Sequence, residues 1–167
     1  VTMNIFNNHC DRVKMANIAQ TINVLQSVIL TKDEKIVLTP TYWAFYLYKV
    51  HQDATLIPMT LQSDKCSLGG VEIDAVNASA SKNADGKIHV TLVNVDPDKE
   101  QTISGALHGF NGKKVTGSVL TSAKINDHNT FEKPNTVGVT TFKDAKISNG
   151  NLSVKLPAKS IVMLEIE

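Results

Sequence analysis

The spacing of apolar residues predicts one clear helix in the first third of the chain. In "TPTYWAFYLYKVHQ", residues 39–52, apolar side chains recur at three- and four-residue steps and form two stripes. Thr39 suits the N-cap position, and Pro40 suits the first helical position. Because both stripes are apolar, we expect this helix to be covered on two sides.

The segment before this helix has a strand pattern without a polar face. In "VKMANIAQTI", residues 13–22, neither set of alternate positions is consistently polar, which is typical of a parallel strand buried on both faces. A shorter helix is indicated upstream, in "TMNIFNNHCDRV". Strand, loop and helix in this order form an α/β unit, which needs a larger parallel sheet or barrel around it. Since the chain also starts without an initiator methionine, we expect a fragment or a processed product.

From residue 60 onward, apolar and polar positions alternate with a period of two. The clearest run is "KIHVTLVNVD", whose two faces carry Ile88, Val90 and Leu92, and His89, Thr91 and Val93. Near the end, residues 152–156 and 162–166 flank a turn at 157–160, which predicts a closing hairpin. Many short strands separated by turn signals such as Asn149-Gly150 predict a mainly β fold, a β-sandwich or jelly roll.

Charge and cysteine content narrow the class of protein. With 17 basic and 16 acidic side chains the net charge is +1, so we expect neither nucleic acid nor an anionic membrane as a partner. No apolar run reaches the roughly 20 residues of a membrane span. Cys10 and Cys66 lie far apart, and their spacing favours two free, buried thiols while leaving one disulfide open.

Motifs for metal, cofactor or covalent chemistry are not recognisable in the sequence. None of the five histidines stands at ligand spacing from a cysteine or a second histidine, so no metal or cofactor site is expected. The acidic residues fall in surface-like strings such as "KDEK" and "DPDKE", which do not supply the two close carboxyl groups of a retaining glycosidase. Gly69-Gly70 does not open a helix and is interpreted as a turn or bulge.

Amides recur at three-residue intervals inside the mostly apolar stretch of residues 15–30. They are Asn17, Gln20, Asn23 and Gln26. A buried amide usually satisfies neighbouring backbone groups, which is the simpler interpretation. Gln20 differs because it lies near the C-terminal end of the predicted strand, where β/α barrels gather their binding groups. Its amide offers donors and an acceptor that suit sugar hydroxyls.

Several strings together resemble the C-terminal third of glycoside hydrolase family 51, whose members are α-L-arabinofuranosidases. In chain order they are "HCDRVKMANIAQTINVLQSVILT", "LTPTYWAFYLYKVHQDATLIP", "VLTSAKINDHNTFEKPNTV" and "LPAKSIVMLEIE". The chain departs from the family pattern at Cys10, where alanine is usual, and at Trp43, where histidine is common. Trp43 is therefore not carried over as a functional position.

This resemblance implies a two-part enzyme, in which a (β/α)8 barrel bearing the active site is followed by a jelly-roll domain. Residues 1–55 would then be the C-terminal remnant of the barrel, with 13–22 as its last strand and 39–52 as the following helix. Residues 56–167 would be the C-terminal β-sandwich domain. Away from the rest of a barrel, residues 1–55 would be disordered, paired with another copy, or docked on the β domain.

The resemblance also implies retaining hydrolysis of terminal non-reducing α-L-arabinofuranosyl groups by two glutamates of earlier barrel strands. Neither glutamate motif occurs here, so no catalytic residue is assigned, and the chain alone is expected to be an inactive, barrel-capping domain. Gln20 is the one substrate-binding residue carried over, with an inferred hydrogen bond to an arabinofuranose hydroxyl, and Asn23 would hold the loop after the strand. The implied partner is arabinan, arabinoxylan or another arabinose-containing oligo- or polysaccharide, and a homo-oligomer stays open.

Two other interpretations of the β region remain open. A carbohydrate-binding module would need exposed aromatic platforms, and beyond residue 60 the aromatic residues are only Phe110, Phe131 and Phe142. The third interpretation is a purely structural or assembly domain.

Overall fold

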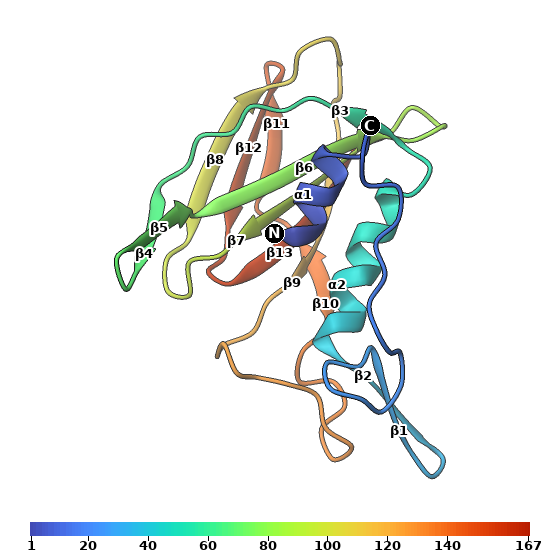
Figure 1. Ribbon diagram of the computed structural model, residues 1–167. Coiled ribbons are helices and arrows are strands. Elements are labelled where there is room, and N and C mark those ends of the chain that lie inside the picture. Colours follow the sequence, from blue (N-terminus) through green and yellow to red (C-terminus); the bar gives the residue numbers. More distant parts are fainter.

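The chain folds into two facing antiparallel sheets, with helices on the outer face of the larger one (Figure 1). The computed structural model describes the backbone of residues 1–167 and the side chains of residues 1–67 and 69–167. The larger sheet has the strand order β10-β9-β13-β7-β6-β3, and the smaller one has the order β11-β12-β8. This arrangement confirms the predicted mainly β, sandwich-type fold.

The bounds of the elements are as follows. The larger sheet contains β3 (Thr55–Ile57), β6 (Val76–Lys82), β7 (Ile88–Asn94), β9 (Val115–Leu120), β10 (Val139–Phe142) and β13 (Ser160–Ile166). The smaller sheet contains β8 (Gln101–Ala106), β11 (Ala145–Ser148) and β12 (Asn151–Leu156). Two separate hairpins are β1 (Ile29–Lys32) with β2 (Lys35–Leu38), and β4 (Lys65–Leu68) with β5 (Val71–Asp74). The helices are α1 (Thr2–Asn8), α2 (Pro40–Tyr48) and the short 3-10 helix η1 (Lys49–His51).

Alternation along the strands builds the core between the two sheets. On β7, Ile88, Val90 and Leu92 point inward and belong to one apolar cluster with residues of both sheets. Fully buried members from other strands include Val154 and Leu156 of β12, and Val162, Leu164 and Ile166 of β13. The opposite face of β7, with His89 and Thr91, lies toward the helices, as the period-two pattern indicates.

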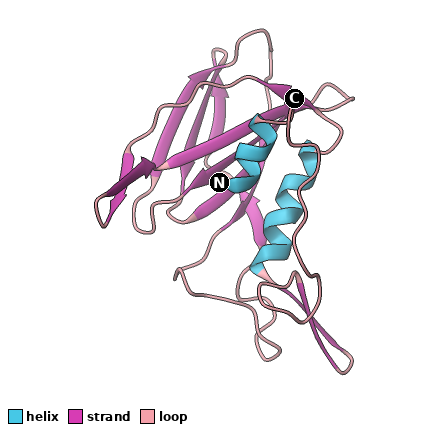
Figure 2. Ribbon diagram, viewed as in Figure 1, coloured by secondary structure: helices cyan, strands magenta, loops and turns pink.

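Helix α2 packs one of its two apolar stripes on the larger sheet. The Thr39 hydroxyl accepts a hydrogen bond from the Tyr42 amide (3.4 Å), and Pro40 occupies the first helical position, so the predicted helix start is confirmed. Leu47 is buried against Leu120 and Val137. The other stripe carries two exposed rings, Phe45 and Tyr46, and so this helix is covered on one side in this chain rather than on two. Figure 2 shows both helices grouped on the same side of the strands.

The predicted strand over residues 13–22 is not formed. The segment runs as a loop, and its single ladder contact is a parallel bridge between Ile22 and Ile29. A parallel strand is held by hydrogen bonds to neighbouring strands, and no strand of the described chain flanks residues 13–21. Apolar side chains are therefore left on the surface, with Met15 77% exposed and Leu25 91% exposed.

The closing hairpin is also a wrong prediction, although both strands exist. β12 belongs to the smaller sheet and β13 to the larger one, so the turn after Leu156 passes from one layer to the other. The two strands bury their apolar faces against each other across the core, which removes more apolar surface from water than a two-stranded ribbon would.

The predicted turns are formed, whereas the prediction for the cysteines holds only in part. Asn149-Gly150 forms the tight turn of the β11–β12 hairpin, with φ values of 50° and 74°, and Gly69-Gly70 forms the turn between β4 and β5. Both cysteines are free, as favoured, but Cys10 is exposed and Cys66 is half-buried. Cys10 is not buried because it follows the end of α1, where the chain leaves the sheet. In the described part of the chain, no helix is long and apolar enough to cross a membrane.

Candidate functional site

Gln20 lies on an exposed loop that leads into the β1–β2 hairpin. The loop, residues 13–28, runs beside α2 toward the N-terminal end of that helix (Figure 1). Thr21, the residue after Gln20, is fixed in place, because its carbonyl accepts hydrogen bonds from the amides of Val28 and Ile29, both at 3.0 Å. The Gln20 side chain itself is open to solvent.

Asn23 holds this loop against the hairpin. Its backbone has a positive φ of 54°, a conformation that asparagine tolerates better than most residues. Its Oδ1 accepts from the Thr31 amide (2.8 Å), and its Nδ2 donates to the Thr31 hydroxyl (2.9 Å). The side chain therefore clamps the loop to β1, which is the role expected for it. Asn17 and Gln26 are exposed and are not gathered around Gln20 by any described hydrogen bond.

A large hollow of the chain lies away from Gln20. A cavity of about 800 Å³ opens between the two sheets beside β8, lined by core side chains such as Ala80, Phe110 and Leu152. Its lining residues begin at Ile57 in the sequence, so neither Gln20 nor any part of its loop contributes. In this chain Gln20 lies on open surface, and a sugar bound to it would need further walls.

A row of hydrogen-bonded polar groups, buried at its centre, joins the helices to the larger sheet, and we call it the polar seam. On the helix side it contains Asn4, Asn7, Asn8, Tyr48 and His51, and on the sheet side Asn77, Ala78, Ser79, Ser81 and Thr91. Asn4 is its centre and is 0% exposed. The Asn4 Oδ1 accepts from the hydroxyls of Tyr48 (2.7 Å) and Ser79 (2.8 Å), and its Nδ2 donates to the Asn77 carbonyl (3.0 Å).

His51 forms the second part of the polar seam. Its Nδ1 lies 2.7 Å from the Ser81 hydroxyl and its Nε2 lies 2.7 Å from the Thr91 hydroxyl. Burial, together with the neighbouring His89, lowers the pKa of His51 to about 4. The ring is therefore neutral near pH 7, with one nitrogen donating and the other accepting.

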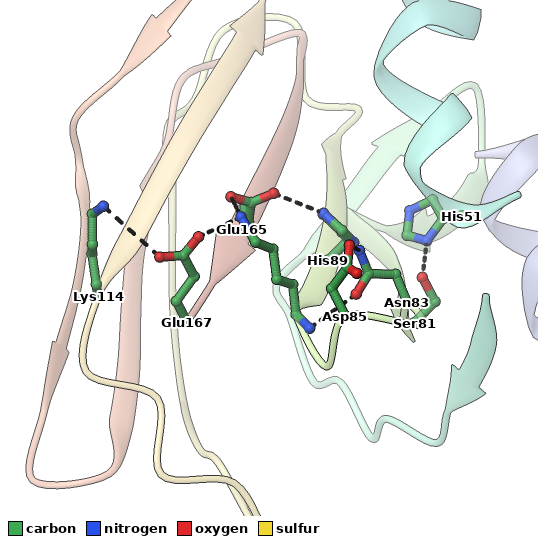
Figure 3. A network of polar contacts seen from close by, with 9 residues as sticks. His51, Ser81, Asn83, Asp85, His89, Lys114, Glu165 and Glu167 are labelled. Atoms are coloured by element: carbon green, nitrogen blue, oxygen red, sulfur yellow. Dashed lines mark hydrogen bonds and ion pairs between the residues drawn. The ribbon is translucent and has the colours of Figure 1, made fainter.

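A network of hydrogen bonds and ion pairs runs from His89 to the end of the sheet (Figure 3). His89 Nε2 lies 3.1 Å from Glu165 Oε2, and Lys87 contacts both Glu165 (2.9 Å) and Glu167. The hydrogen bond from Lys87 is the main cause that lowers the pKa of Glu165. Like the polar seam, these groups pair with one another, and they fix strand β13 against β7.

The polar seam was not predicted from the sequence, although the spacing of its asparagine and serine residues is regular. Asn4, Asn7 and Asn8 stand at helical three- and four-residue spacing, so they share one face of α1. Ser79 and Ser81 alternate in the same way along β6. Neither half predicts its partner, because Ser79 and Asn4 are 75 residues apart in the sequence.

The arrangement fits a joint between two structural units better than a reaction centre. Among the described residues, no group of three or more His, Cys, Asp and Glu side chains could hold a metal ion. The aromatic residues of the sandwich are also unsuited to stacking on sugars, because Phe142 is buried and Phe110 and Phe131 are half-buried. These features define a β-sandwich with two helices and a hairpin-bearing segment fixed to the outer face of its larger sheet.

Comparison with known proteins identifies the family. The alpha-L-arabinofuranosidase C-terminal domain family matches residues 1–160, and the chain belongs to this family, the C-terminal portion of glycoside hydrolase family 51 enzymes. An intracellular exo-alpha-L-arabinofuranosidase of Bacteroides ovatus is 52% identical over 168 residues, which cover 100% of this chain and 33% of that protein. A probable alpha-L-arabinofuranosidase C of Aspergillus flavus is 30% identical over 135 residues, covering 75% of this chain and 27% of that protein.

Solved structures agree over almost the whole chain. The GH51 arabinofuranosidase from Xanthomonas axonopodis pv. citri matches with a TM-score of 0.96 and 43% identity, covering 99% of this chain and 34% of that one. The chain thus spans about a third of the length of the relatives that it matches.

Proposed function

We propose that the chain is the C-terminal part of a retaining α-L-arabinofuranosidase. The complete protein would remove terminal non-reducing α-L-arabinofuranosyl groups from arabinan, arabinoxylan or arabino-oligosaccharides. The observation that carries this proposal is the 52% identity, over the full length of the chain, to a protein named as an exo-alpha-L-arabinofuranosidase. Retention would require two carboxyl groups about 5 Å apart, one as acid and base and one as nucleophile. Both would come from the part of the protein outside this chain.

Within that enzyme, residues 56–167 would cap the barrel and residues 1–55 would belong to it. Two interfaces support this role. The polar seam joins α1 and η1 to β6 and β7, and an apolar cluster around Leu47 joins α2 to β9 and β13. A sandwich bonded so extensively to the last helix of a barrel would keep that helix in place. The apolar residues left exposed on the loop, such as Met15 and Leu25, would then be covered by neighbouring barrel elements.

Gln20 would hydrogen-bond a hydroxyl of the arabinofuranosyl group. Its side chain is exposed, and its loop leads to the N-terminal end of α2. In a β/α unit this end of the helix adjoins the C-terminal end of the preceding strand, where barrels place their binding groups. The other walls of the sugar site would come from the remaining strand ends.

The complete protein allows a direct test of activity and of the Gln20 assignment. We expect it to release arabinose from an aryl α-L-arabinofuranoside with the anomeric configuration retained, as followed by NMR, and we expect the 167-residue chain alone to release none. Gln20→Ala should raise KM about 10-fold or more, because one good hydrogen bond to a bound group contributes about 1.5 kcal/mol. Gln52→Ala, a change at another exposed glutamine, is the matched control. An inverted product would exclude the retaining mechanism, and equal KM values for the two variants would exclude the role of Gln20.

A further inference from the structure

The connection between β9 and β10 is far longer than the pairing of these strands requires. Leu120 and Val139 are the first facing pair of the two antiparallel strands, so a tight turn could join them. Instead, residues 121–138 leave the sheet and extend to the base of the β1–β2 hairpin (Figure 1). Irregular loops longer than about 12–15 residues are uncommon in compact domains and are usually either functional or disordered linkers. We call residues 121–138 the β9–β10 loop.

Asn129 connects the β9–β10 loop to the β1–β2 hairpin by a side-chain hydrogen bond. It is 4% exposed, and both of its donor hydrogens and its acceptor oxygen are used. Its Nδ2 donates to the carbonyls of Leu38 and Val137, both at 2.7 Å, and its Oδ1 accepts from the Val137 amide, also at 2.7 Å. One buried carboxamide therefore links a sandwich loop to the last residue of β2.

The hairpin transmits this link to the neighbour of Gln20 in two steps. Leu38 faces Ile29 in the β1–β2 ladder, and the Ile29 amide donates to the Thr21 carbonyl at 3.0 Å. The clamp between Asn23 and Thr31 fixes the same loop a second time. Gln20 thus lies directly before a residue whose position depends, through one strand pair, on Asn129.

We propose that Asn129 is a positioning residue, through which the β-sandwich sets where the Gln20 amide meets the sugar. The inference rests on the proposed sugar-binding role of Gln20. It gives the sandwich a part in substrate binding without any contact between sandwich and substrate. It also explains why a sandwich loop makes such a long excursion to reach a strand-to-helix connection of the other unit.

A double-mutant cycle in the complete protein tests this inference. We expect Asn129→Ala to lower kcat/KM for an aryl α-L-arabinofuranoside about 10- to 100-fold, because small misplacements of a binding group have effects of this size. If Asn129 acts through Gln20, the kcat/KM of the double variant Gln20→Ala/Asn129→Ala should lie within about twofold of that of Gln20→Ala alone. The effects of two residues linked by contacts are not additive when one acts through the other. Losses that multiply would overturn the inference. Asn135→Ala, an exposed asparagine of the same loop, should leave kcat/KM unchanged.

The failure of this inference differs from the failure of the proposed function. If Gln20→Ala binds and hydrolyses like the parent protein, the sugar-binding role of Gln20 is wrong and the inference falls with it. If Gln20→Ala is impaired while Asn129→Ala behaves like Asn135→Ala, the positioning role alone is wrong.

Hydrogen exchange in the 167-residue chain gives a readout that does not depend on activity. Asn129→Ala should speed the exchange of the Val28, Ile29 and Thr31 amides at least 10-fold while the amides of Val90 and Leu92 in the core strand stay protected. Should Asn129→Ala unfold the chain, Asn129→Asp keeps the acceptor for the Val137 amide and repeats the measurement. Uniform loss of protection in both variants would overturn the inference, because Asn129 would then hold the sandwich rather than the loop.

Discussion

The two faces of the larger sheet are held by different physical forces, although the same strands supply both. The inner face buries aliphatic side chains such as Val90 and Leu164 against the smaller sheet. The outer face meets α1 and η1 through the polar seam and meets α2 through a small apolar cluster around Leu47. Apolar burial is non-directional and supplies most of the stability, whereas hydrogen bonds between buried groups fix orientation. The inner face is therefore expected to carry most of the stability, and the outer face to fix how the helices lie on the sheet.

The largest effect should come from the inner face. Leu164→Ala removes a fully buried side chain from the core and should cost about 2–5 kcal/mol of unfolding free energy, including the cavity left behind. Urea denaturation of the 167-residue chain measures it. Leu25→Ala, at a leucine that is 91% exposed, should change the midpoint little. Similar losses at both positions would mean that the sandwich core is not the main source of stability.

A smaller and more local effect is expected at the centre of the polar seam. Asn4→Ala leaves two hydroxyls and the Asn77 carbonyl without their shared partner, at a cost of about 1–3 kcal/mol. Because α1 touches the sheet rather than the core, its amides should lose protection from hydrogen exchange while those of β7 keep it. Asn8→Ala removes one hydrogen bond of an exposed residue and is the milder control. Equal loss of protection in α1 and β7 would contradict a separate joint.

The polar seam should also weaken in acid, whereas the apolar core contains no group that titrates. The folded-state pKa of His51 is about 4 against an ordinary value of 6.5, so the unfolded chain binds more protons between these two pH values. The contribution of the neutral ring is therefore complete above pH 6.5 and is lost as the pH falls toward 4. We expect a loss of roughly 1–2 kcal/mol over this window, because solvent near the half-buried ring moderates the effect.

A neutral replacement isolates the His51 contribution from that of its neighbours. The ring faces the hydroxyls of Ser81 and Thr91 and, further along β7, His89, which is paired with Glu165. His51→Gln can still hydrogen-bond both hydroxyls but does not titrate, so its stability should vary less between pH 6.5 and 4. Glu165 has a lowered pKa and loses its own contribution only at lower pH. Parallel pH profiles for the parent and His51→Gln would show that His51 does not carry the effect.

The sequence was sufficient for features that depend on local chemistry. The start of α2 at Thr39 and Pro40 and the two faces of β7 were predicted, because capping and alternation act within a few residues. Features that need a distant partner were not. The 13–22 segment has the composition of a buried strand but has no flanking strand in this chain, and β12 and β13 were placed side by side although they lie in different layers.

The residues of the candidate site also differ in whether the sequence could reveal them. Gln20 could be named only through family resemblance, and its role as a sugar ligand stays a prediction. The loop-holding role of Asn23 was also inferred from the resemblance, and the hydrogen bonds between Asn23 and Thr31 agree with it. Asn129 was not singled out, because its hydrogen-bond partner Leu38 lies 91 residues away in the sequence and the contact is to a backbone carbonyl. A carbonyl group carries no sequence signal, so only the fold reveals this link.

The smallest effect concerns a turn, where backbone conformation rather than burial or side-chain bonding decides stability. Gly150 ends the β11–β12 turn with a φ of 74°, and a methyl group there would meet no atom within 4 Å. Gly150→Ala should therefore cost only the left-handed conformation, about 1 kcal/mol in a denaturation experiment. Gly105 in β8 also has open space around it but lacks a positive φ, so Gly105→Ala should be neutral within about 0.5 kcal/mol. Equal losses of unfolding free energy for the two substitutions would exclude the turn conformation as the cause. The smaller sheet would then be sensitive to side chains added along its exposed face as well as in its core.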